Sequence, residues 1–472
     1  MECLYRDGSP CLDAEIAVAT SFRDPGGRLS VDENGVFRQV FPAGLQNWRA
    51  FKMSATVRRL ELAGQIVDTR VVSELDRLTI LEHQRAPFAS FPHEWPPQML
   101  YAAAELTLDL GEGLVTEGLG LKDATPHNVL FHGPRAVFVD VLSAETRTPG
   151  DGIWLAGAQF VRTFLLPLIM NRELAIPLGQ MFLTRRDGIE AEEVARALPW
   201  WKRALPPLLG LVTLPGLLTR FSGGQKLPVM TDEMARYILA AHFRRLRKLL
   251  RRFRPRPTQS GWTRYATGCP SYTEAQREAK QAFVRRVLQV MSPKNVLDVG
   301  ANDGEYSLLA AVSGASVVAI DSDPAVCGRL YEVARQRHAD ILPLVVDFAR
   351  PSPAVGWRCA EQSGFLDRAT KAFDCVLMLA VLHHLLVTDQ IPLDQILVVA
   401  STMTRQWLVL EYVDPADPMF RKLARGRDAL YGWLTRATFL SHVAVHFDVV
   451  DSCEIPNSAR SVYLLRLRRT AV

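Results

Sequence analysis

Short apolar runs alternate with segments of helical length in the C-terminal half of the chain. Four of these runs start at about Val296, Ser316, Ile341 and Phe373. Continuous apolar runs of this length are typical of strands that are buried on both faces of a parallel sheet. Strands that recur with helix-length spacers predict βαβ units, in which ligands bind at the carboxyl ends of the strands. We therefore predict an α/β domain with a mostly parallel sheet in this half.

The N-terminal half mixes short strands with longer helical patterns. Pro255 and Pro257 end the last of these helical patterns and mark a domain boundary. We predict an α+β domain with a helical lobe over residues 1–256, including a small lobe at about residues 20–90, and the α/β domain over residues 257–472. The predicted elements of the first domain are a β-hairpin of Leu29–Val31 and Val36–Phe41, a helix over about Leu45–Leu62, strands at Val67–Val72 and Leu78–Leu81, and an apolar helix over Met99–Leu114.

Positive charge is concentrated in one helical segment, Arg244–Arg256. The chain has a formal net charge of +5, and this segment alone contributes eight Lys and Arg residues. A basic amphipathic helix can lie on an anionic membrane surface, and it can equally be a solvated helix face that leads into a linker. The segment lacks the interleaved aromatic residues and the motifs of a nucleic-acid-binding protein, so we do not expect a nucleic-acid partner.

Composition and cysteine usage predict a globular cytoplasmic protein. Hydrophobic residues make up 48% of the chain and charged residues 22%, as in ordinary folded proteins. The seven cysteines are scattered and odd in number, so neither a disulfide framework nor a zinc site is indicated. A secretory signal has an apolar segment behind a basic start, and residues 1–13 contain no such segment. If the protein contacts the inner membrane, the basic segment Arg244–Arg256 is the candidate surface.

The strongest chemical signal is a glycine-rich turn after the first of the apolar runs. The run ends in Gly300-Ala301-Asn302-Asp303-Gly304 and continues directly into a helical pattern. Small residues are needed where another group approaches the backbone closely, and a helix N-terminus directs its N–H groups at a bound ligand. Polar residues accompany the later strands: Asp321 ends the second, Asp347 follows the third, and Asp374 starts the fourth, which leads into His383 and His384.

These residues resemble the cofactor site of class I S-adenosylmethionine (SAM)-dependent methyltransferases, over roughly residues 265–472. An NAD(P)-binding Rossmann domain shares the glycine turn and one acidic residue, but it has no counterpart of Asp347 or of the two histidines. The resemblance implies antiparallel edge strands, for which Phe447–Asp451 and Ser461–Leu467 are the candidates. It assigns cofactor binding to Asp298, Gly300, Asn302 (where many members have glycine) and Gly304, to Asp321 at the ribose, to Asp347 at the adenine amine and to Asp374 beside the methionine part.

His383 and His384 are the candidate catalytic bases. Methyl transfer from a sulfonium is an in-line displacement, so the enzyme mainly aligns donor and acceptor and supplies a base where the acceptor must lose a proton. For each histidine, packing in the core is the alternative. No Asn-Pro-Pro-Tyr-type motif of nucleic-acid amine methylation occurs, so we expect a small-molecule or glycan acceptor. The other side chains expected near this site are Tyr265, Tyr272, Glu411 and Arg460.

A second group of residues, in the N-terminal half, fits phosphoryl transfer. Asp123 and Asn128 stand five residues apart, and a predicted hairpin of Val129–Phe131 and Ala136–Val139 leads to Asp140. Transfer from ATP needs a carboxylate that orients the attacking hydroxyl, and an Asn and an Asp that hold the metal. The spacing resembles the catalytic loop of protein-kinase-like and aminoglycoside-phosphotransferase-like enzymes, which implies ATP with Mg²⁺ as ligands.

The kinase-like pattern has three departures. Leu121 stands where a histidine is expected, and Arg38 is the basic residue on the strand that should carry a lysine. Gly26-Gly27 is the candidate for the glycine-rich loop. An arginine can contact phosphate, but it is not interchangeable with lysine. An active phosphotransferase, a degenerate one, and a loop and hairpin without nucleotide therefore all stay open.

Two functional hypotheses follow. In the first, the chain is an enzyme that joins a SAM-dependent methyltransferase to a kinase-like domain. This arrangement resembles bifunctional enzymes that modify bacterial surface glycans, and also nodulation-related bacterial methyltransferases. In the second, the N-terminal half is a non-catalytic module that brings a membrane, a glycan or a protein partner to the methyltransferase.

Overall fold

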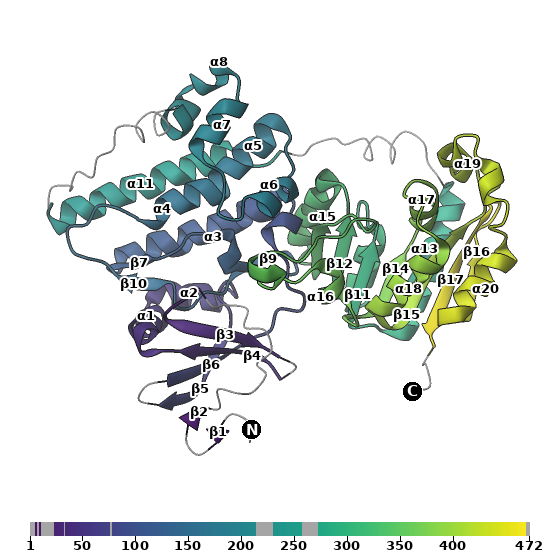
Figure 1. Cartoon of the computed structure of the whole chain (residues 1–472), viewed down its shortest axis with the longest axis horizontal. Coiled ribbons are helices and arrows are strands. Elements are labelled where there is room, and N and C mark those ends of the chain that lie inside the picture. The colour runs from purple at the N-terminus through teal and green to yellow at the C-terminus, as the bar shows by residue number, and fades with distance from the viewer. Residues whose placement is uncertain are drawn as a thin grey trace.

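The computed structural model describes residues 5–6, 9–10, 23–32, 34–75, 78–213, 230–256 and 272–468. These residues form two halves that lie side by side (Figure 1). The N-terminal half contains a small β-rich lobe and a larger helical lobe. The C-terminal half is built around a single seven-stranded sheet. The boundary expected between the halves, and Tyr265 with it, falls mostly in residues 257–271, which lie outside the described residues.

The C-terminal sheet has the strand order β13-β12-β11-β14-β15-β17-β16. The first five of these strands are parallel, and β17 runs antiparallel to both of its neighbours. The expected α/β architecture is confirmed, as a mixed sheet with an antiparallel edge. The strands are β11 (Asn295–Val299), β12 (Ser316–Asp321), β13 (Ile341–Val345), β14 (Phe373–Met378), β15 (Thr404–Val413), β16 (Phe447–Glu454) and β17 (Arg460–Leu467).

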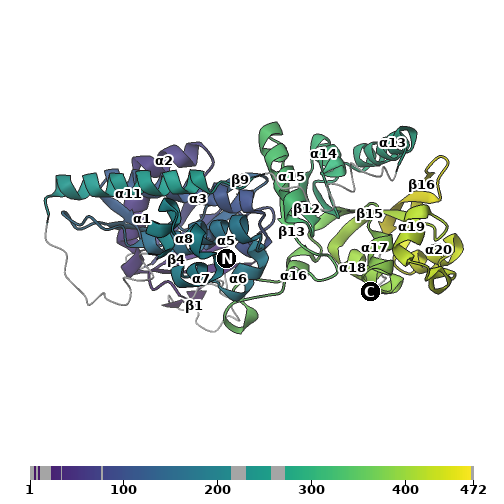
Figure 2. The ribbon, with the colours of Figure 1, turned by 90° about the horizontal axis from the view of Figure 1, so that it is seen from above.

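Helices cover both faces of this sheet, because successive strand residues point to opposite faces. Val296 packs with apolar residues of α13 and α14, whereas its neighbour Leu297 belongs to the core that contains α16, α18 and α20. Figure 2 shows these two helical layers above and below the sheet. The helices are α13 (Glu274–Met291), α14 (Glu305–Val312), α15 (Pro324–Arg337), η5 (Trp357–Cys359), α16 (Phe365–Ala369), α17 (Leu382–Val387), α18 (Leu393–Met403), α19 (Pro418–Ala424), η6 (Asp428–Tyr431) and α20 (Arg436–His446).

The small lobe of the N-terminal half is a four-stranded antiparallel sheet of order β3-β4-β6-β5 with two helices. A single helix was expected over Leu45–Leu62, but the chain breaks at Ser54. The Ser54 hydroxyl accepts a hydrogen bond from the Val57 backbone N–H at 3.2 Å, and this N-cap starts a second helix. The elements are β1 (Tyr5–Arg6), β2 (Ser9–Pro10), β3 (Gly27–Val31), β4 (Val36–Val40), α1 (Pro42–Met53), α2 (Ala55–Leu62), β5 (Thr69–Leu75) and β6 (Leu78–His83).

The rest of the N-terminal half is mostly helical and is organised around the buried helix α3. Two short antiparallel strand pairs, the hairpin of β8 with β9 and the pair of β7 with β10, lie beside it. Its elements are η1 (Pro92–Glu94), α3 (Pro97–Thr116), β7 (Leu119–Leu121), η2 (Pro126–Asn128), β8 (Val129–His132), β9 (Arg135–Phe138), β10 (Ala144–Thr146), α4 (Ala156–Phe160), η3 (Val161–Leu165), α5 (Leu166–Leu174), α6 (Leu178–Thr184), α7 (Ala191–Ala197), α8 (Trp200–Arg203), α9 (Pro206–Leu208), η4 (Leu209–Thr213) and α11 (Asp232–Arg252).

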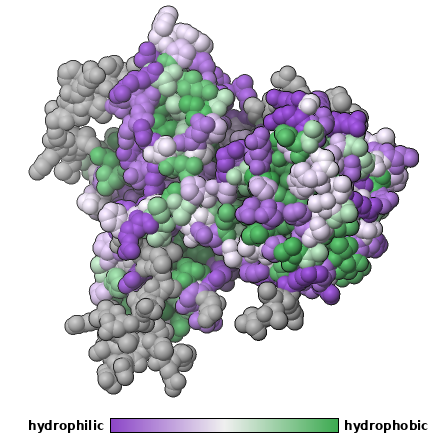
Figure 3. All heavy atoms as spheres, turned by 45° about the vertical axis from the view of Figure 1, so that its right-hand side comes forward, coloured by the Kyte–Doolittle hydropathy of each residue, from purple (hydrophilic) through white to green (hydrophobic). Residues whose placement is uncertain are grey.

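The basic segment forms the last turns of α11, which packs along α3. Leu246 and Leu250 are buried against the lobe. Arg247 contributes to this packing, because its guanidinium donates to Asp109 at 2.5 Å and to Glu112 at 2.7 Å on α3. On the face drawn in Figure 3, hydrophobic and hydrophilic residues are interspersed over both halves. None of the helices in the described residues combines the length and apolar character needed to cross a membrane.

The two halves share one hydrophobic core, and a buried ion pair crosses their interface. Arg368 on α16 pairs with Glu94 of η1, whose side chain is 0% exposed. Phe88, Phe91 and Phe365 surround the guanidinium, with ring centroids 4.8–5.7 Å from its carbon. Both charges are removed from water, so the loss of either one would leave the other buried without a compensating charge.

A second set of contacts joins the segment before α16 to the N-terminal half. Glu361 accepts from the Arg23 Nε at 2.8 Å and also pairs with Arg186, and its side chain is only 5% exposed. The next residue, Gln362, contacts His127 with 3.0 Å between the amide nitrogen and Nδ1. The C-terminal half is therefore held by both lobes of the N-terminal half.

We expect Arg368→Ala to destabilise the protein strongly, because it leaves the Glu94 carboxylate buried without a partner. Loss of one member of a buried pair costs about 3–5 kcal/mol. The matched control is Arg335→Ala, which breaks a half-exposed pair with Glu332 and should cost about 1 kcal/mol or less. The measurement is urea unfolding followed by circular dichroism. Equal shifts for the two variants would contradict the assignment of the Arg368 pair as a structural contact.

Candidate active site

The turn between β11 and α14 has a backbone that requires glycine at two positions. Gly300 and Gly304 have φ angles of +67° and +79°, a region that other residues rarely adopt. A Cβ on Gly304 would also lie 2.2 Å from Leu330 Cδ1. The Gly300 N–H donates to the Ile320 carbonyl at 2.9 Å, which folds the turn against the end of β12. Asn302, at φ +47°, is a residue type that tolerates this conformation.

Asp321 holds this turn through hydrogen bonds from the backbone. One carboxylate oxygen accepts from the Asn302 N–H at 3.0 Å, and the other accepts from the Asp323 N–H at 2.9 Å. Burial raises the pKa of the Asp321 carboxyl, although these backbone hydrogen bonds oppose the rise. A carboxylate has about four lone-pair sites, so two hydrogen bonds leave it able to accept from a ligand.

Asp298 lies beneath the turn and is buried, with 2% of its surface exposed. Its carboxylate accepts from the Ser307 hydroxyl at 2.5 Å, in the first turn of α14. Burial raises the pKa of Asp298 to about 7, and the Ser307 hydrogen bond and the charge of Lys280 reduce that rise. Asp298 therefore fixes the N-terminus of α14 from below.

Asp347 follows β13 at the same carboxyl edge of the sheet, and its side chain is 33% exposed. One of its oxygens accepts from the Ala349 N–H at 2.9 Å, and the other accepts from Arg350 Nε at 3.0 Å. Asp321, Asp347 and the glycine turn thus meet at one edge, as the strand order requires.

Asp374 does not belong to this group, and its assignment to the cofactor is wrong. It lies at the amino end of β14, so it is at the opposite edge of the sheet. There its carboxylate accepts from the backbone N–H groups of Lys294 and Asn295 at 3.0 Å each and pairs with Arg405 at 3.2 Å. Asp374 therefore pairs with backbone N–H groups at the start of the neighbouring strand β11.

His383 and His384 lie on α17, directly after β14. Their ring centroids are 4.4 Å apart, and His383 is 4% exposed. Burial lowers the pKa of His383 well below its usual value, and the nearby positive charges of Arg460 and Lys280 add to this effect. Burial also lowers the pKa of His384. The Nδ1 atom of His383 has no hydrogen-bond partner among the described residues. A neutral imidazole with a free nitrogen is able to accept a proton.

A buried polar network adjoins His383. Lys280 Nζ donates to Glu411 at 2.6 Å, and the hydroxyl of Tyr272 donates to the same carboxylate. Arg460 Nε donates to Asp417 at 2.8 Å. These ion pairs connect α13, the end of β15, the start of β17 and α19. Glu411 and Arg460 were expected near the catalytic site, and their charges are paired inside the protein. Lys280 was not predicted as a site residue, because a lysine on a helix is normally exposed.

The N-terminal residues that resemble a kinase site lie in one region. Arg38 on β4 is buried and pairs with Asp140 at 3.1 Å. The Asn128 carbonyl accepts from the Val139 N–H at 2.9 Å, which places Asn128 beside Asp140, and the Asn128 amide nitrogen is buried without a described partner. Asp123 is exposed at the start of the same loop. Among the described residues no cluster of three or more His, Cys, Asp or Glu could hold a metal ion. Asn128 and Asp140 remain the metal ligands that the kinase-like pattern predicts.

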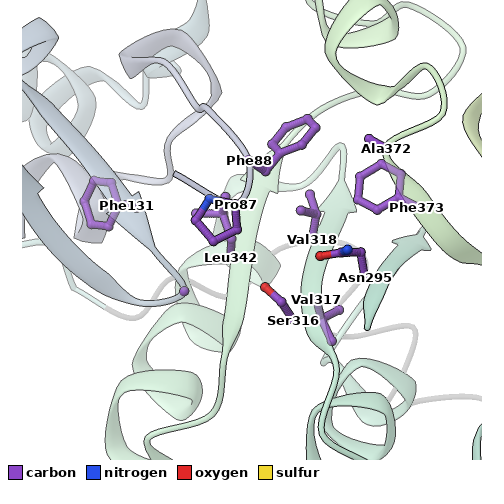
Figure 4. Close-up of a pocket in the computed structure, with 11 residues that line it drawn as sticks. Pro87, Phe88, Phe131, Asn295, Ser316, Val317, Val318, Leu342, Ala372 and Phe373 are labelled. Atoms are coloured by element: carbon purple, nitrogen blue, oxygen red, sulfur yellow. The ribbon is translucent and has the colours of Figure 1, made fainter. Parts of the chain in front are cut away.

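A cavity at the interface is too small for a ligand. It encloses about 20 Å³ between the two halves, at the amino ends of β11, β12 and β14. A space of this size holds one water molecule at most. Figure 4 shows the residues around it, which are Pro87, Phe88, Phe131, Gly133, Asn295, Ser316, Val317, Val318, Leu342, Ala372 and Phe373.

Comparison with known proteins agrees with this geometry. A family model described as a methyltransferase domain matches residues 242–448. Over its full length, the chain is similar to the nodulation protein NoeA of Rhizobium meliloti (strain 1021), with 28% identity over 459 residues that cover 94% of this chain and 95% of the relative.

Similar solved structures each cover less than half of this chain. The N-methyltransferase NodS from Bradyrhizobium japonicum WM9 has 16% identity and a TM-score of 0.31, over 42% of this chain and 98% of NodS. The SAM-bound magnesium protoporphyrin IX methyltransferase from Synechocystis PCC 6803 has 16% identity and a TM-score of 0.31. The match covers 45% of this chain and 92% of that enzyme. The bifunctional kinase-methyltransferase WbdD has 16% identity and a TM-score of 0.30. The match covers 44% of this chain and 43% of WbdD.

The C-terminal half is therefore a SAM-dependent methyltransferase domain with a Rossmann-like fold. The family match supports this assignment, and so do the strand order and the glycine turn.

We expect Asp298→Asn to change how stability depends on pH. The folded-state pKa of Asp298, about 7, lies above its ordinary value of 3.8. A raised carboxyl pKa contributes stability that is present below pH 3.8 and is lost as pH rises through about 7. Asparagine does not ionise, so the melting temperature of the wild type should fall relative to that of the variant between about pH 4 and about pH 8.

The control for this experiment is Asp303→Asn, because the Asp303 side chain is 56% exposed. Its melting temperature should follow that of the wild type at every pH. A difference between wild type and Asp298→Asn that does not change with pH would contradict the raised pKa.

Proposed function

We propose that this chain transfers a methyl group from SAM to a small-molecule or glycan acceptor, and that its N-terminal half is a kinase-like domain. The observation that carries the first part is the turn at Gly300–Gly304, held against β12 by the Asp321 carboxylate. The turn lets a ligand approach the backbone, and the N-terminus of α14, whose dipole favours negative groups, lies at the same place.

The ribose and the adenine of the cofactor each have a suitable residue at this edge. Asp321 can accept hydrogen bonds from the ribose hydroxyls, and the partly exposed Asp347 can accept from the adenine amine. Asp298 acts indirectly, because its contact with Ser307 orients α14. SAM supplies the methyl group as an electrophile, and the residues of the chain bind and align it.

The residues near His383 suit a polar acceptor. His383 is neutral at pH 7, because its pKa lies well below the usual value, and its Nδ1 atom lacks a described partner. Its unprotonated ring has room for the proton that a hydroxyl or amine loses on methylation, but the lowered pKa makes it a weaker base than a histidine in water. The neighbouring pairs of Lys280 with Glu411 and Arg460 with Asp417 provide further polar groups. Methyl label from the cofactor should accordingly appear in the glycan or small-molecule fraction of a cell extract, and not in nucleic acid.

The kinase-like assignment of the N-terminal half rests on the order and position of its elements. A small β-lobe with helices α1 and α2 comes first, and α3, the Asp123–Asn128 loop and the β8–β9 hairpin follow in chain order. Asp140 comes directly after this hairpin and faces Arg38 of the small lobe. Asn128 and Asp140 would hold Mg²⁺ with ATP in such a domain.

The alternative, a non-catalytic module, also has an observation in its favour. The loop that contains Asn128 is in contact with the methyltransferase domain through His127 and Gln362, at 3.0 Å. Burial lowers the pKa of His127 to about 4, so this residue is neutral and held in the interface. In this alternative the loop serves as a docking surface for the second domain.

We expect Asp321→Ala to lose affinity for S-adenosylhomocysteine, because the variant lacks the ribose acceptor and releases the glycine turn. Hydrogen bonds to a charged group contribute about 1.5–3 kcal/mol each, which corresponds to a loss of tenfold or more. Asp374→Ala is the matched control, since Asp374 lies at the opposite edge of the sheet. The measurement is isothermal titration calorimetry. Equal affinities in the two variants would argue against the proposed site.

The kinase-like hypothesis predicts that ATP with Mg²⁺ binds the wild type and that Asp140→Ala loses most of this binding. Asp123→Asn should bind ATP like the wild type, because Asp123 would orient the acceptor and not the metal. Calorimetry with the three proteins tests this prediction. If millimolar ATP does not bind the wild type, the N-terminal half is a non-catalytic module.

A further inference from the structure

A cavity of about 200 Å³ lies between the two halves at the carboxyl edge of the methyltransferase sheet. The N-terminal half forms one wall with η1, the residues after it, and α6. The other wall consists of the residues that follow β12 and β13. The lining residues are His93, Trp95, Pro97, Pro177, Leu178, Gly179 and Leu183 on the first wall, and Ser322, Pro324, Val345, Val346, Asp347, Arg350, Ser352 and Pro353 on the second.

The second wall of this cavity is part of the cofactor site proposed above. Ser322 directly follows the ribose residue Asp321, and Asp347 is the proposed adenine contact. A ligand that contacts both Asp321 and Asp347 would therefore have its Asp347 end in this cavity. The N-terminal half is the surface that closes it on the far side.

The size and the lining suit a flat, mostly apolar ring with polar atoms on its edge. Pockets for whole small-molecule ligands measure about 300–1,000 Å³, so this cavity would take only one end of such a ligand. Most of its lining is proline, leucine, valine and tryptophan. Its polar side chains are those of His93, Ser322, Asp347, Arg350 and Ser352.

His93 supplies an unused polar atom on the N-terminal wall. The residue is 5% exposed, and its Nε2 has no hydrogen-bond partner among the described residues. Buried polar atoms in folded proteins are usually paired, so an unpaired one beside a cavity points to a ligand. Burial lowers the pKa of His93, so the ring is neutral and Nε2 can donate or accept according to its tautomer.

The N-terminal wall is packed within its own half and is joined to the methyltransferase domain by a buried ion pair. Glu94, next to His93, forms the buried pair with Arg368. The Trp95 ring packs edge-on against Phe131, with centroids 5.0 Å apart. At Gly179 a Cβ would lie 3.0 Å from the His93 carbonyl oxygen, so α6 and η1 are in close contact. The cavity is thus bounded by rigid elements on both sides.

We propose that this cavity receives the adenine end of the cofactor, so that the N-terminal half completes the SAM site of the C-terminal half. The proposal rests on the proposed SAM site, and it adds η1 and α6 as a second wall. It assigns the N-terminal half a role in methyl transfer that does not depend on its binding ATP. The methyltransferase domain alone would then bind the cofactor weakly.

The test compares two tryptophan substitutions in the full-length protein. Leu183 lines the cavity and is 41% exposed, whereas Leu205 has a similar exposure of 49% and lies outside it. Leu183→Trp should weaken binding of S-adenosylhomocysteine about tenfold or more, because the larger side chain fills space that the adenine needs. Leu205→Trp should bind as the wild type does. His93→Gln, which disturbs the polar atom without adding bulk, should also weaken binding.

A second ligand shows which end of the cofactor occupies the cavity. Methylthioadenosine keeps the adenosine part and lacks the amino-acid part, so Leu183→Trp should weaken it by the same factor. Unchanged affinity for both ligands in Leu183→Trp and His93→Gln would overturn the proposal, as would a loss confined to S-adenosylhomocysteine. If the wild type itself fails to bind S-adenosylhomocysteine, the proposed SAM site is wrong, and that result is distinct from a failure of the cavity assignment.

Discussion

The hydrogen bonds from backbone N–H groups to the Asp321 carboxylate are the contacts on which the methyltransferase site depends. The hydrogen bond from Asn302 fastens the glycine turn after β11 to the end of the neighbouring strand β12, and the one from Asp323 holds the carboxylate in place. The left-handed backbone at Gly300 and Gly304 makes this close approach possible. The buried Asp298 supports the same turn from beneath, through Ser307. The geometry of the site is therefore fixed by local contacts before any ligand arrives.

The interface between the two halves places this site in a larger architecture. The Arg368–Glu94 pair is buried among three phenylalanine rings, and Glu361 joins two arginines of the N-terminal half. Interfaces within one chain are usually polar and permit domain motion, but here a continuous apolar core and a desolvated ion pair connect the halves. These contacts hold the N-terminal half in the position where it lines the cavity at the carboxyl edge of the methyltransferase sheet.

The sequence predicted what depends on local pattern, and it missed what depends on contacts between distant segments. The parallel strands and the glycine turn follow from apolar runs and from backbone conformations that glycine permits. Asp374 was misplaced because the resemblance to the family's fourth-strand motif was followed, although its position at the start of a parallel strand puts it at the edge opposite the ligand. The burial of Lys280 with Glu411, and the position of α6 beside Asp347, could not be found, since both join residues more than a hundred positions apart.

A crystal structure of the full-length protein with S-adenosylhomocysteine tests the central claim most directly. We predict density along the carboxyl ends of β11, β12 and β13, with the ribose at Asp321 and the adenine between Asp347 and α6. A ligand bound elsewhere, a site at this edge that stays empty at saturating concentration, or a nicotinamide dinucleotide in its place would contradict the account.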